Sequence, residues 1–186
     1  MNTYLALVHH PIRNKVGEVV TTSVTNLDIH DISRSCRTFG IKKYFLVTPL
    51  PLQKDLVHEI LDHWKTDTAN AFNPDRQDAL AIAEAQDSVE DTISRVEALE
   101  GKKPIVVVTG ANFKEFNGSV QNLKDYATKE ARPVLVLFGT GWGLHQKILD
   151  MAEFKLSPIV SLNSDGYNHL SVRSAVAIYL DRLFGE

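Results

Sequence analysis

Short apolar runs alternate along this chain with stretches in which apolar residues recur every three or four positions. The runs are rich in β-branched and aromatic residues, as expected for buried strands: Tyr4–Val8, Tyr44–Val47, Ile105–Val108, Val134–Phe138 and Pro158–Leu162. The stretches with helical spacing are Asp28–Phe39, Leu52–Trp64, Ser88–Leu99, Ser119–Lys129, Leu144–Phe154 and His169–Phe184. This alternation predicts an α/β fold in which a mainly parallel sheet of five or six strands carries helices on both faces.

The chain is long enough for one complete hydrophobic core. It has 186 residues, of which 44% are hydrophobic, so we expect a single domain spanning residues 1–186. The segment Ala79–Ala85 is ambiguous. Its alanines favour a helix, whereas Leu80-Ala81-Ile82-Ala83 after a predicted turn favours a short buried strand. We favour the strand.

The composition argues against several classes of protein. Cys36 is the only cysteine, which excludes an intrachain disulfide and a cysteine-built metal site, so we expect it to be a buried small hydrophobe. The histidines lack partners at metal-ligand spacing, so we expect no metal. Because no apolar run approaches the roughly 18 residues of a membrane span and the start lacks an export signal, we expect a cytoplasmic protein with no membrane partner.

The formal net charge of −3 requires that any nucleic-acid site be a local basic surface. Basic residues gather in the N-terminal region, where we would place RNA: Arg13, Lys15, Arg34, Arg37, Lys42 and Lys43. A second group, Phe113, Lys114, Phe116, Asn117 and Lys124, follows the predicted strand Ile105–Val108. This second group has two interpretations. It can bind RNA, by stacking a base and contacting the RNA backbone, or it can simply pack against the protein.

A glycine-rich turn follows the apolar run Leu135–Phe138. Gly139, Gly141 and Gly143 alternate with Thr140 and Trp142, and a helical pattern resumes at Leu144. Glycine allows a sharp turn and brings backbone amides close to a ligand. The spacing is neither that of a dinucleotide fold nor that of a phosphate loop. The turn therefore predicts a nucleotide-like ligand, with a plain strand-to-helix turn as the alternative.

The segment 21–40 concentrates hydroxyl, acidic and basic side chains on a loop and the helix after it. Asn26 or Asp28 is suited to cap the helix, and Gly40 to end it in a left-handed conformation. Arg34 and Arg37 are three residues apart on one helical face. They can form either a solvated salt-bridge network with the neighbouring acids or a fork that binds phosphate.

Three segments together resemble the motifs of the SPOUT superfamily of RNA methyltransferases. Asp28, Arg34 and Gly40, spaced six residues apart before a strand, resemble the first motif. The three glycines resemble the second, and 158–160 through 168–172 resemble the third. The match is closest to a small bacterial subgroup described as RNA methyltransferases, which shares the start of this chain at 17–26.

The resemblance implies a fold and a cofactor that the residue pattern does not show. It implies a C-terminal deep trefoil knot, a homodimer with RNA reached across the interface, and S-adenosylmethionine bound in a bent shape by three loops. The cofactor-binding residues implied in this way are Thr109, Gly110, Phe138, Gly139, Gly141, Gly143, Ile159, Leu162, His169, Leu170 and Ser171. A homodimer also fits the apolar residues Leu170, Val176, Ile178, Leu180 and Leu183, which are too many for a last helix that packs on one side only.

The resemblance also assigns candidate catalytic residues. Arg34 falls where related 2′-O-methyltransferases place an arginine that activates the ribose hydroxyl or contacts phosphate, and Asp28 lies beside it. His169 is either a general base or a residue that packs near the cofactor. The chain departs from the family at Asp28, where many relatives have Asn, and at 167–169, where Tyr-Asn-His replaces Ser-Leu-Asn.

Three functions follow as hypotheses. The first is methyl transfer from S-adenosylmethionine to a ribose 2′-oxygen or a base nitrogen of tRNA or rRNA. The second is specific methylation of guanine N1, with Asp28 or Asp31 as the candidate base. The third is a module that binds the cofactor or RNA without chemistry.

Overall fold

A six-stranded parallel sheet forms the centre of the molecule. We describe it from a computed structural model, which places residues 1–66, 68, 71 and 73–185. The strands lie in the order β5–β4–β1–β7–β6–β8, and every neighbouring pair is parallel. Their bounds are β1 Thr3–Val8, β4 Tyr44–Val47, β5 Ala83–Gln86, β6 Ile105–Val108, β7 Val134–Gly139 and β8 Phe154–Lys155.

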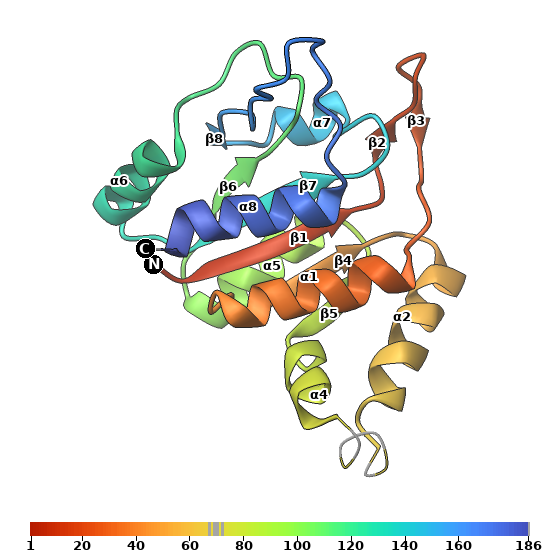
Figure 1. The fold of residues 1–186 in the computed structure, drawn as a ribbon. Coiled ribbons are helices and arrows are strands. Elements are labelled where there is room, and N and C mark those ends of the chain that lie inside the picture. The colour runs from red at the N-terminus through yellow and green to blue at the C-terminus, as the bar shows by residue number, and fades with distance from the viewer. Residues whose placement is uncertain (67, 69–70, 72, 186) are drawn as a thin grey trace.

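Helices cover both faces of this sheet, which confirms the predicted α/β class (Figure 1). Of the helices that the structure describes, four pack on one face: α1 Asn26–Thr38, α2 Pro51–His63, α6 Val120–Glu130 and α8 Val172–Phe184. Two pack on the other: α5 Val89–Glu100 and α7 Gln146–Leu149. The short helix α4, Pro74–Leu80, packs against α1. Along β1, Leu5 and Leu7 join the first core while Tyr4 and Ala6 join the second, as the two-residue period of a strand requires.

The order of the strands reverses at β1. The chain first proceeds outward from β1 to β4 and β5, and then crosses to place β6, β7 and β8 on the other side of β1. Ligands of open parallel sheets bind outside the carboxyl ends of the strands at such a reversal. Here that edge carries the segments that follow β6, β7 and β8.

Several predicted boundaries are wrong. Pro158–Leu162 is a loop, and the sixth strand is instead β8, which begins at Phe154, the last residue of the stretch predicted as the helix Leu144–Phe154. Only Gln146–Leu149 of that stretch is helical, because Phe154 is buried and Lys155 extends the ladder beside Val108. The segment Ala79–Ala85 divides, with α4 ending at Leu80 and β5 beginning at Ala83.

The sequence pattern also missed a two-stranded antiparallel hairpin, β2 Ile12–Arg13 with β3 Val19–Val20. Its strands are too short to show a periodic signal. The hairpin begins just after β1 and stands beside the loop that joins β7 to α7 (Figure 1), where Ile12 forms a bridge with Leu144.

The cap of α1 is Thr25 and not Asn26 or Asp28. The Thr25 hydroxyl accepts a hydrogen bond from the Asp28 backbone amide, as in a typical N-terminal cap. Two other predictions at this helix are confirmed: Cys36 is fully buried, and Gly40 has a left-handed φ of +71°.

The apolar residues of α8 pack mainly into the core of the chain itself. Val176, Leu180 and Leu183 are buried there, whereas Leu170 precedes the helix and is exposed. The number of apolar residues on this segment therefore does not by itself require a partner, and the homodimer stays a prediction. No helix in the described part of the chain is long and apolar enough to span a membrane.

Candidate active site

Two glycine turns at the edge described above leave no room for side chains. A Cβ added to Gly139 would lie 2.9 Å from the Leu144 nitrogen, and one added to Gly110 would lie 2.6 Å from the Phe113 ring. Real Cβ atoms do not approach other atoms so closely. Gly141 and Gly143 have φ values of +54° and +98°, which disfavour residues with a side chain. The sharp turns predicted from the glycines are therefore present, and the binding of a ligand to them stays a prediction.

The loop between β7 and α7 is held by bonds to three other segments. Within the loop, the Gly143 amide donates to the Thr140 carbonyl at 2.9 Å. From the hairpin, the Arg13 amide donates to the Gly143 carbonyl at 3.0 Å. The Thr140 hydroxyl donates to the Val8 carbonyl at 3.1 Å and lies 2.5 Å from the Thr22 hydroxyl. The loop is therefore preorganised.

His9, which follows β1, is part of the same hydrogen-bond network. Its Nδ1 lies 3.0 Å from the Thr22 hydroxyl oxygen. Because Thr140 donates its proton to Val8, Thr22 must donate to Thr140, and the remaining bond requires a proton on His9 Nδ1. Burial lowers the pKa of His9 to about 4, against a smaller opposing effect of the Asp28 charge. His9 is therefore neutral at neutral pH, and its buried Nε2 has no partner among the described residues.

The loop after β8, residues 156–171, contains the third predicted cofactor segment, Ile159–Ser171, and is largely exposed. Leu162, Leu170 and His169 all lie on the surface, and the His169 ring stands 5.9 Å from that of Tyr167. The Asn168 side-chain amide donates to the Ile159 carbonyl at 3.0 Å, which closes the loop on itself. Its last residue, Ser171, caps α8.

Asp28, predicted to be catalytic, is buried and has partners on both carboxylate oxygens. Thr25 donates to Oδ2 at 2.6 Å, and Arg173 Nη1 donates to Oδ1 at 2.6 Å. Arg173 Nε also lies 3.6 Å from the Asp31 carboxylate. This cluster joins the first turn of α8 to the first turn of α1, and the two helices lie side by side (Figure 1).

Sequence reasoning missed Arg173, although a signal was present. A positive charge in the first turn of a helix is unfavourable to the helix dipole. An arginine at that position therefore indicates an acidic partner elsewhere in the fold. The chain offered many acids, and only the packing of α8 on α1 selects Asp28 and Asp31.

The two arginines of α1 differ in their surroundings. Arg37 Nε donates to Asp78 at 2.7 Å in an exposed ion pair. Arg37 thus forms a salt bridge, but its partner is Asp78 on α4 and not one of the neighbouring acids of α1. Arg34 is exposed and forms no ion pair with any residue that the structure describes. It borders a shallow hollow with Asp31, Ser35, Thr38 and Phe39. Arg34 is not brought against Asp28, because six residues of helix place the two on different faces.

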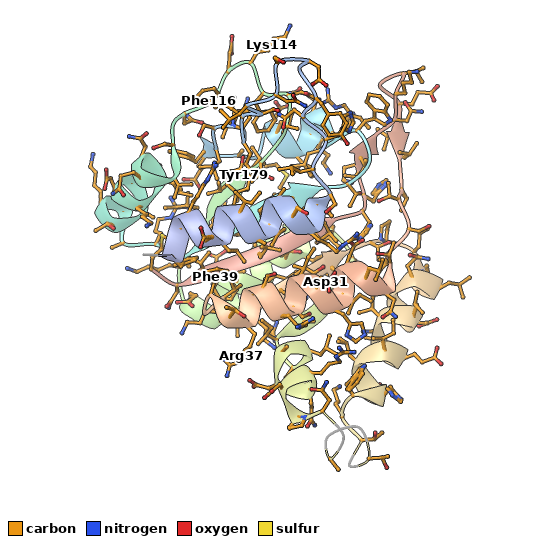
Figure 2. All side chains as sticks on the ribbon, in the orientation of Figure 1. Asp31, Arg37, Phe39, Lys114, Phe116 and Tyr179 are labelled. Atoms are coloured by element: carbon orange, nitrogen blue, oxygen red, sulfur yellow. The ribbon has the colours of Figure 1, made fainter. Side chains whose placement is uncertain are left out.

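The other predicted RNA-binding residues lie on several different elements, and Lys43 is half-buried in an ion pair with Glu84. Arg13 and Lys15 belong to the β2–β3 hairpin. Lys114 and Phe116 project from the loop after β6, at the opposite end of the molecule from Arg37 (Figure 2). Phe113 instead packs on Gly110, which favours the packing alternative for that ring.

Similarity to solved structures agrees with this architecture. A probable methyltransferase of Bordetella pertussis superposes with a TM-score of 0.65 at 16% identity, covering 98% of this chain and 94% of that one. At that identity the likeness shows the fold alone.

The sequence comparisons show the family. The model of a SAM-dependent RNA methyltransferase family matches residues 2–185, and the chain belongs to that family. An uncharacterized protein of Aquifex aeolicus is 33% identical over all of this chain and 89% of its own length. A protein of Oleidesulfovibrio alaskensis named tRNA (guanine-N(1)-)-methyltransferase is 42% identical, and this chain spans 42% of its length. S-adenosylmethionine is the cofactor of the family.

Proposed function

We propose that this protein transfers a methyl group from S-adenosylmethionine to an RNA nucleotide. The observation that carries the proposal is the set of glycine turns at the carboxyl ends of β6 and β7. There, Gly110 and Gly139 would clash with their surroundings if they carried a Cβ. Such turns fit a cofactor held by backbone groups, which is how the three loops Thr109–Gly110, 138–143 and 159–171 would bind it.

The cofactor supplies an already activated methyl group, so the residues of the chain have to position the acceptor and remove its proton. We assign the contact with the acceptor nucleotide to Arg34, which is exposed and has no acidic partner among the described residues. An arginine in that state can bind a phosphate with two parallel donors or stabilise a developing oxyanion. The ribose 2′-oxygen is therefore the acceptor that we favour.

We assign a positioning role to Asp28. Both its oxygens already accept hydrogen bonds, from Thr25 and Arg173, so accepting a substrate proton would compete with existing bonds. His169 and Asp31 are the exposed candidates for the general base.

Guanine N1 is the second candidate acceptor. Its support is the name tRNA (guanine-N(1)-)-methyltransferase, which two related proteins carry, one from Oleidesulfovibrio alaskensis and one from Nitratidesulfovibrio vulgaris. Each protein is 42% identical to this chain. This chain spans 42% of the length of either relative, so the named activity can belong to the part outside the match. A cofactor- or RNA-binding module without chemistry is the third hypothesis.

The proposal includes three features of the resemblance: a homodimer, a C-terminal trefoil knot and action in the cytoplasm. In the dimer, Arg34 of one subunit would serve the cofactor loops of the other. Light scattering at dilute concentration tests the dimer, and a clean monomer would remove the shared site.

The deciding experiment is nucleoside mass spectrometry of tRNA and rRNA from a deletion strain. A missing 2′-O-methylnucleoside supports the favoured acceptor, a missing 1-methylguanosine supports the second candidate, and an unchanged profile contradicts both. Complementation with Arg34→Ala should fail to restore the modification. With the purified protein, we expect that variant to lose about a hundredfold in rate, corresponding to roughly 3 kcal/mol, at unchanged cofactor affinity. Lys129→Ala on α6 is the matched control.

A further inference from the structure

The loop between β7 and α7 displays a tryptophan that neither the fold nor the cofactor turn requires. Trp142 stands between Gly141 and Gly143, and 56% of its surface is exposed. Among the described residues its ring has no aromatic or cationic partner, whereas Trp64 has His30, His63 and Arg76 around it. An exposed indole forgoes the stabilisation that burial would give, so its presence points to a ligand.

The ring is presented from a preorganised backbone. The Gly143 amide and carbonyl are both bonded, and the hydroxyl network of Thr22 and Thr140 holds the start of the loop. Ile12 pairs with Leu144 directly after the loop. Because the backbone of the loop is already fixed, binding to the Trp142 ring does not carry the entropic cost of ordering that backbone.

Unpaired positive charge lies along the same loop. The guanidinium of Arg13 lies 3.9 Å from the position of a Cβ on Gly143, and its backbone carbonyl lies 3.8 Å from that of a Cβ on Gly141. Lys15 follows on the hairpin. In the part of the chain that the structure describes, neither side chain forms an ion pair, and the nearby carboxylate of Glu18 is bonded by Asn14. The surface thus combines an aromatic face with free cations.

We infer that Trp142 and Arg13 form a binding site for an unstacked RNA nucleotide, with the base on the indole and a flanking phosphate on the guanidinium. This inference rests on the proposed RNA substrate, and it specifies the part of the protein surface that the RNA strand contacts. Stacking on aromatic rings and contacts with arginine are the usual means of holding single-stranded RNA. The site lies on the same loop as the cofactor turn, so a nucleotide held there stands next to the reacting one.

Charge distinguishes this occupant from the adenine of the cofactor. S-adenosylmethionine carries a sulfonium and an ammonium against one carboxylate, and it has no phosphate. The unpaired Arg13 and Lys15 beside the ring therefore disfavour it, whereas they match an RNA backbone. An apolar protein partner is disfavoured for the same reason.

The test measures RNA affinity, cofactor affinity and methylation separately. The probe is a fluorescein-labelled single-stranded RNA, compared with its duplex and followed by anisotropy at saturating S-adenosylhomocysteine. Trp142→Ala should weaken single-strand binding about tenfold or more, because base stacking on one ring is worth roughly 1–3 kcal/mol. Trp142→Phe should retain most of the affinity. Arg13→Gln should reduce the salt dependence by about one phosphate contact, a slope change of roughly 0.7.

Leu52→Ala removes an exposed apolar residue from α2 and is the control. Wild-type RNA affinity in Trp142→Ala would overturn the inference while leaving the proposed methylation intact. A loss confined to S-adenosylhomocysteine binding, or a change of oligomeric state, would assign Trp142 to the cofactor or to a second copy, and would also overturn it. If the wild-type protein binds RNA through Trp142 but methylates none, the inference holds and the proposed function fails.

Discussion

The loops after β7 and β8 flank the same edge of the sheet but are held very differently. The loop at 139–145 is bonded to β1, to the hairpin and to Thr22. The loop at 156–171 is fixed at its start, where the Tyr179 hydroxyl donates to the Ser157 carbonyl, and then makes mainly local bonds. Leu162 within it is completely exposed. One loop is therefore preorganised and the other is not, and we propose that a ligand or a partner covers the second.

The largest expected effect concerns His9, which anchors the preformed loop. Its pKa falls from 6.5 to about 4 on folding because burial disfavours the charged ring. The unfolded chain therefore takes up the proton first as the pH falls. Stability supplied by the neutral ring is present above about pH 6.5 and is lost down to about pH 4, amounting to roughly 3 kcal/mol. Chemical denaturation across this range should show the loss.

The control for this prediction is His9→Gln, which keeps a side-chain hydrogen bond but cannot titrate. Its free energy of unfolding should depend less on pH than that of the wild-type protein by the stated amount. Identical pH profiles would show that His9 does not anchor the loop through a neutral ring.

A somewhat smaller effect is expected at Arg173, which ties the end of the exposed loop to α1. Arg173→Met leaves the Asp28 carboxylate buried with only the Thr25 hydroxyl as side-chain donor. Loss of one partner of a fully buried ion pair lowers the free energy of unfolding by about 3–5 kcal/mol. Because the Arg173 side chain is 31% exposed, we expect a smaller loss of about 2 kcal/mol. Denaturant unfolding measures this cost.

The exposed ion pair between Arg37 on α1 and Asp78 on α4 gives the comparison. Arg37→Met should lower the free energy of unfolding by less than about 1 kcal/mol. Combining Arg173→Met with Asp28→Asn should recover stability, since the uncompensated charge is removed. If the double variant is as unstable as Arg173→Met alone, the ion pair is not the reason for the loss.

A matched pair of glycines tests whether only one loop is preformed. Gly141 and Gly166 both have positive φ, so valine at either position costs roughly 1–2 kcal/mol of backbone strain. Only at Gly141 would a Cβ meet neighbours, Ile12 at 3.3 Å and Thr22 at 3.4 Å, whereas Gly166 has open space. Calorimetry should show S-adenosylhomocysteine affinity reduced about tenfold or more in Gly141→Val, a loss of at least about 1.4 kcal/mol. Gly166→Val should bind S-adenosylhomocysteine nearly as tightly as the wild-type protein does. Equal losses of affinity in the two variants would show that the two loops are equally preformed.

The smallest effect is expected at Asn168, which closes the exposed loop on the Ile159 carbonyl. Asn168→Ala removes this bond, worth about 1 kcal/mol. Hydrogen exchange of the segment 159–168 should become faster in the free protein and slow down again with S-adenosylhomocysteine. Exchange that the ligand leaves unchanged would contradict the view that the ligand covers this loop.

Most of the sheet and the glycine turn could be predicted from the sequence. Tyr44–Val47 and Ile105–Val108 match observed strands, because a strand buried on both faces reads as an unbroken apolar run. The same rule failed at Pro158–Leu162, where an apolar run forms an exposed loop instead. The two-residue strand β8 was missed because two residues carry no period.

The sequence by itself determined the alternation of strands and helices, the burial of Cys36 and the glycine turn, because each depends on local spacing or on the conformational range of single residues. Only the tertiary structure decided which charges meet. Asp28 and Arg173 are 145 residues apart in the chain, and Arg37 has a partner while Arg34, on the same helical face, has none among the described residues. Such pairings depend on the packing of α8 and α4 against α1. The local sequence at Arg173 indicates that an acidic partner exists, but only this long-range packing selects which one.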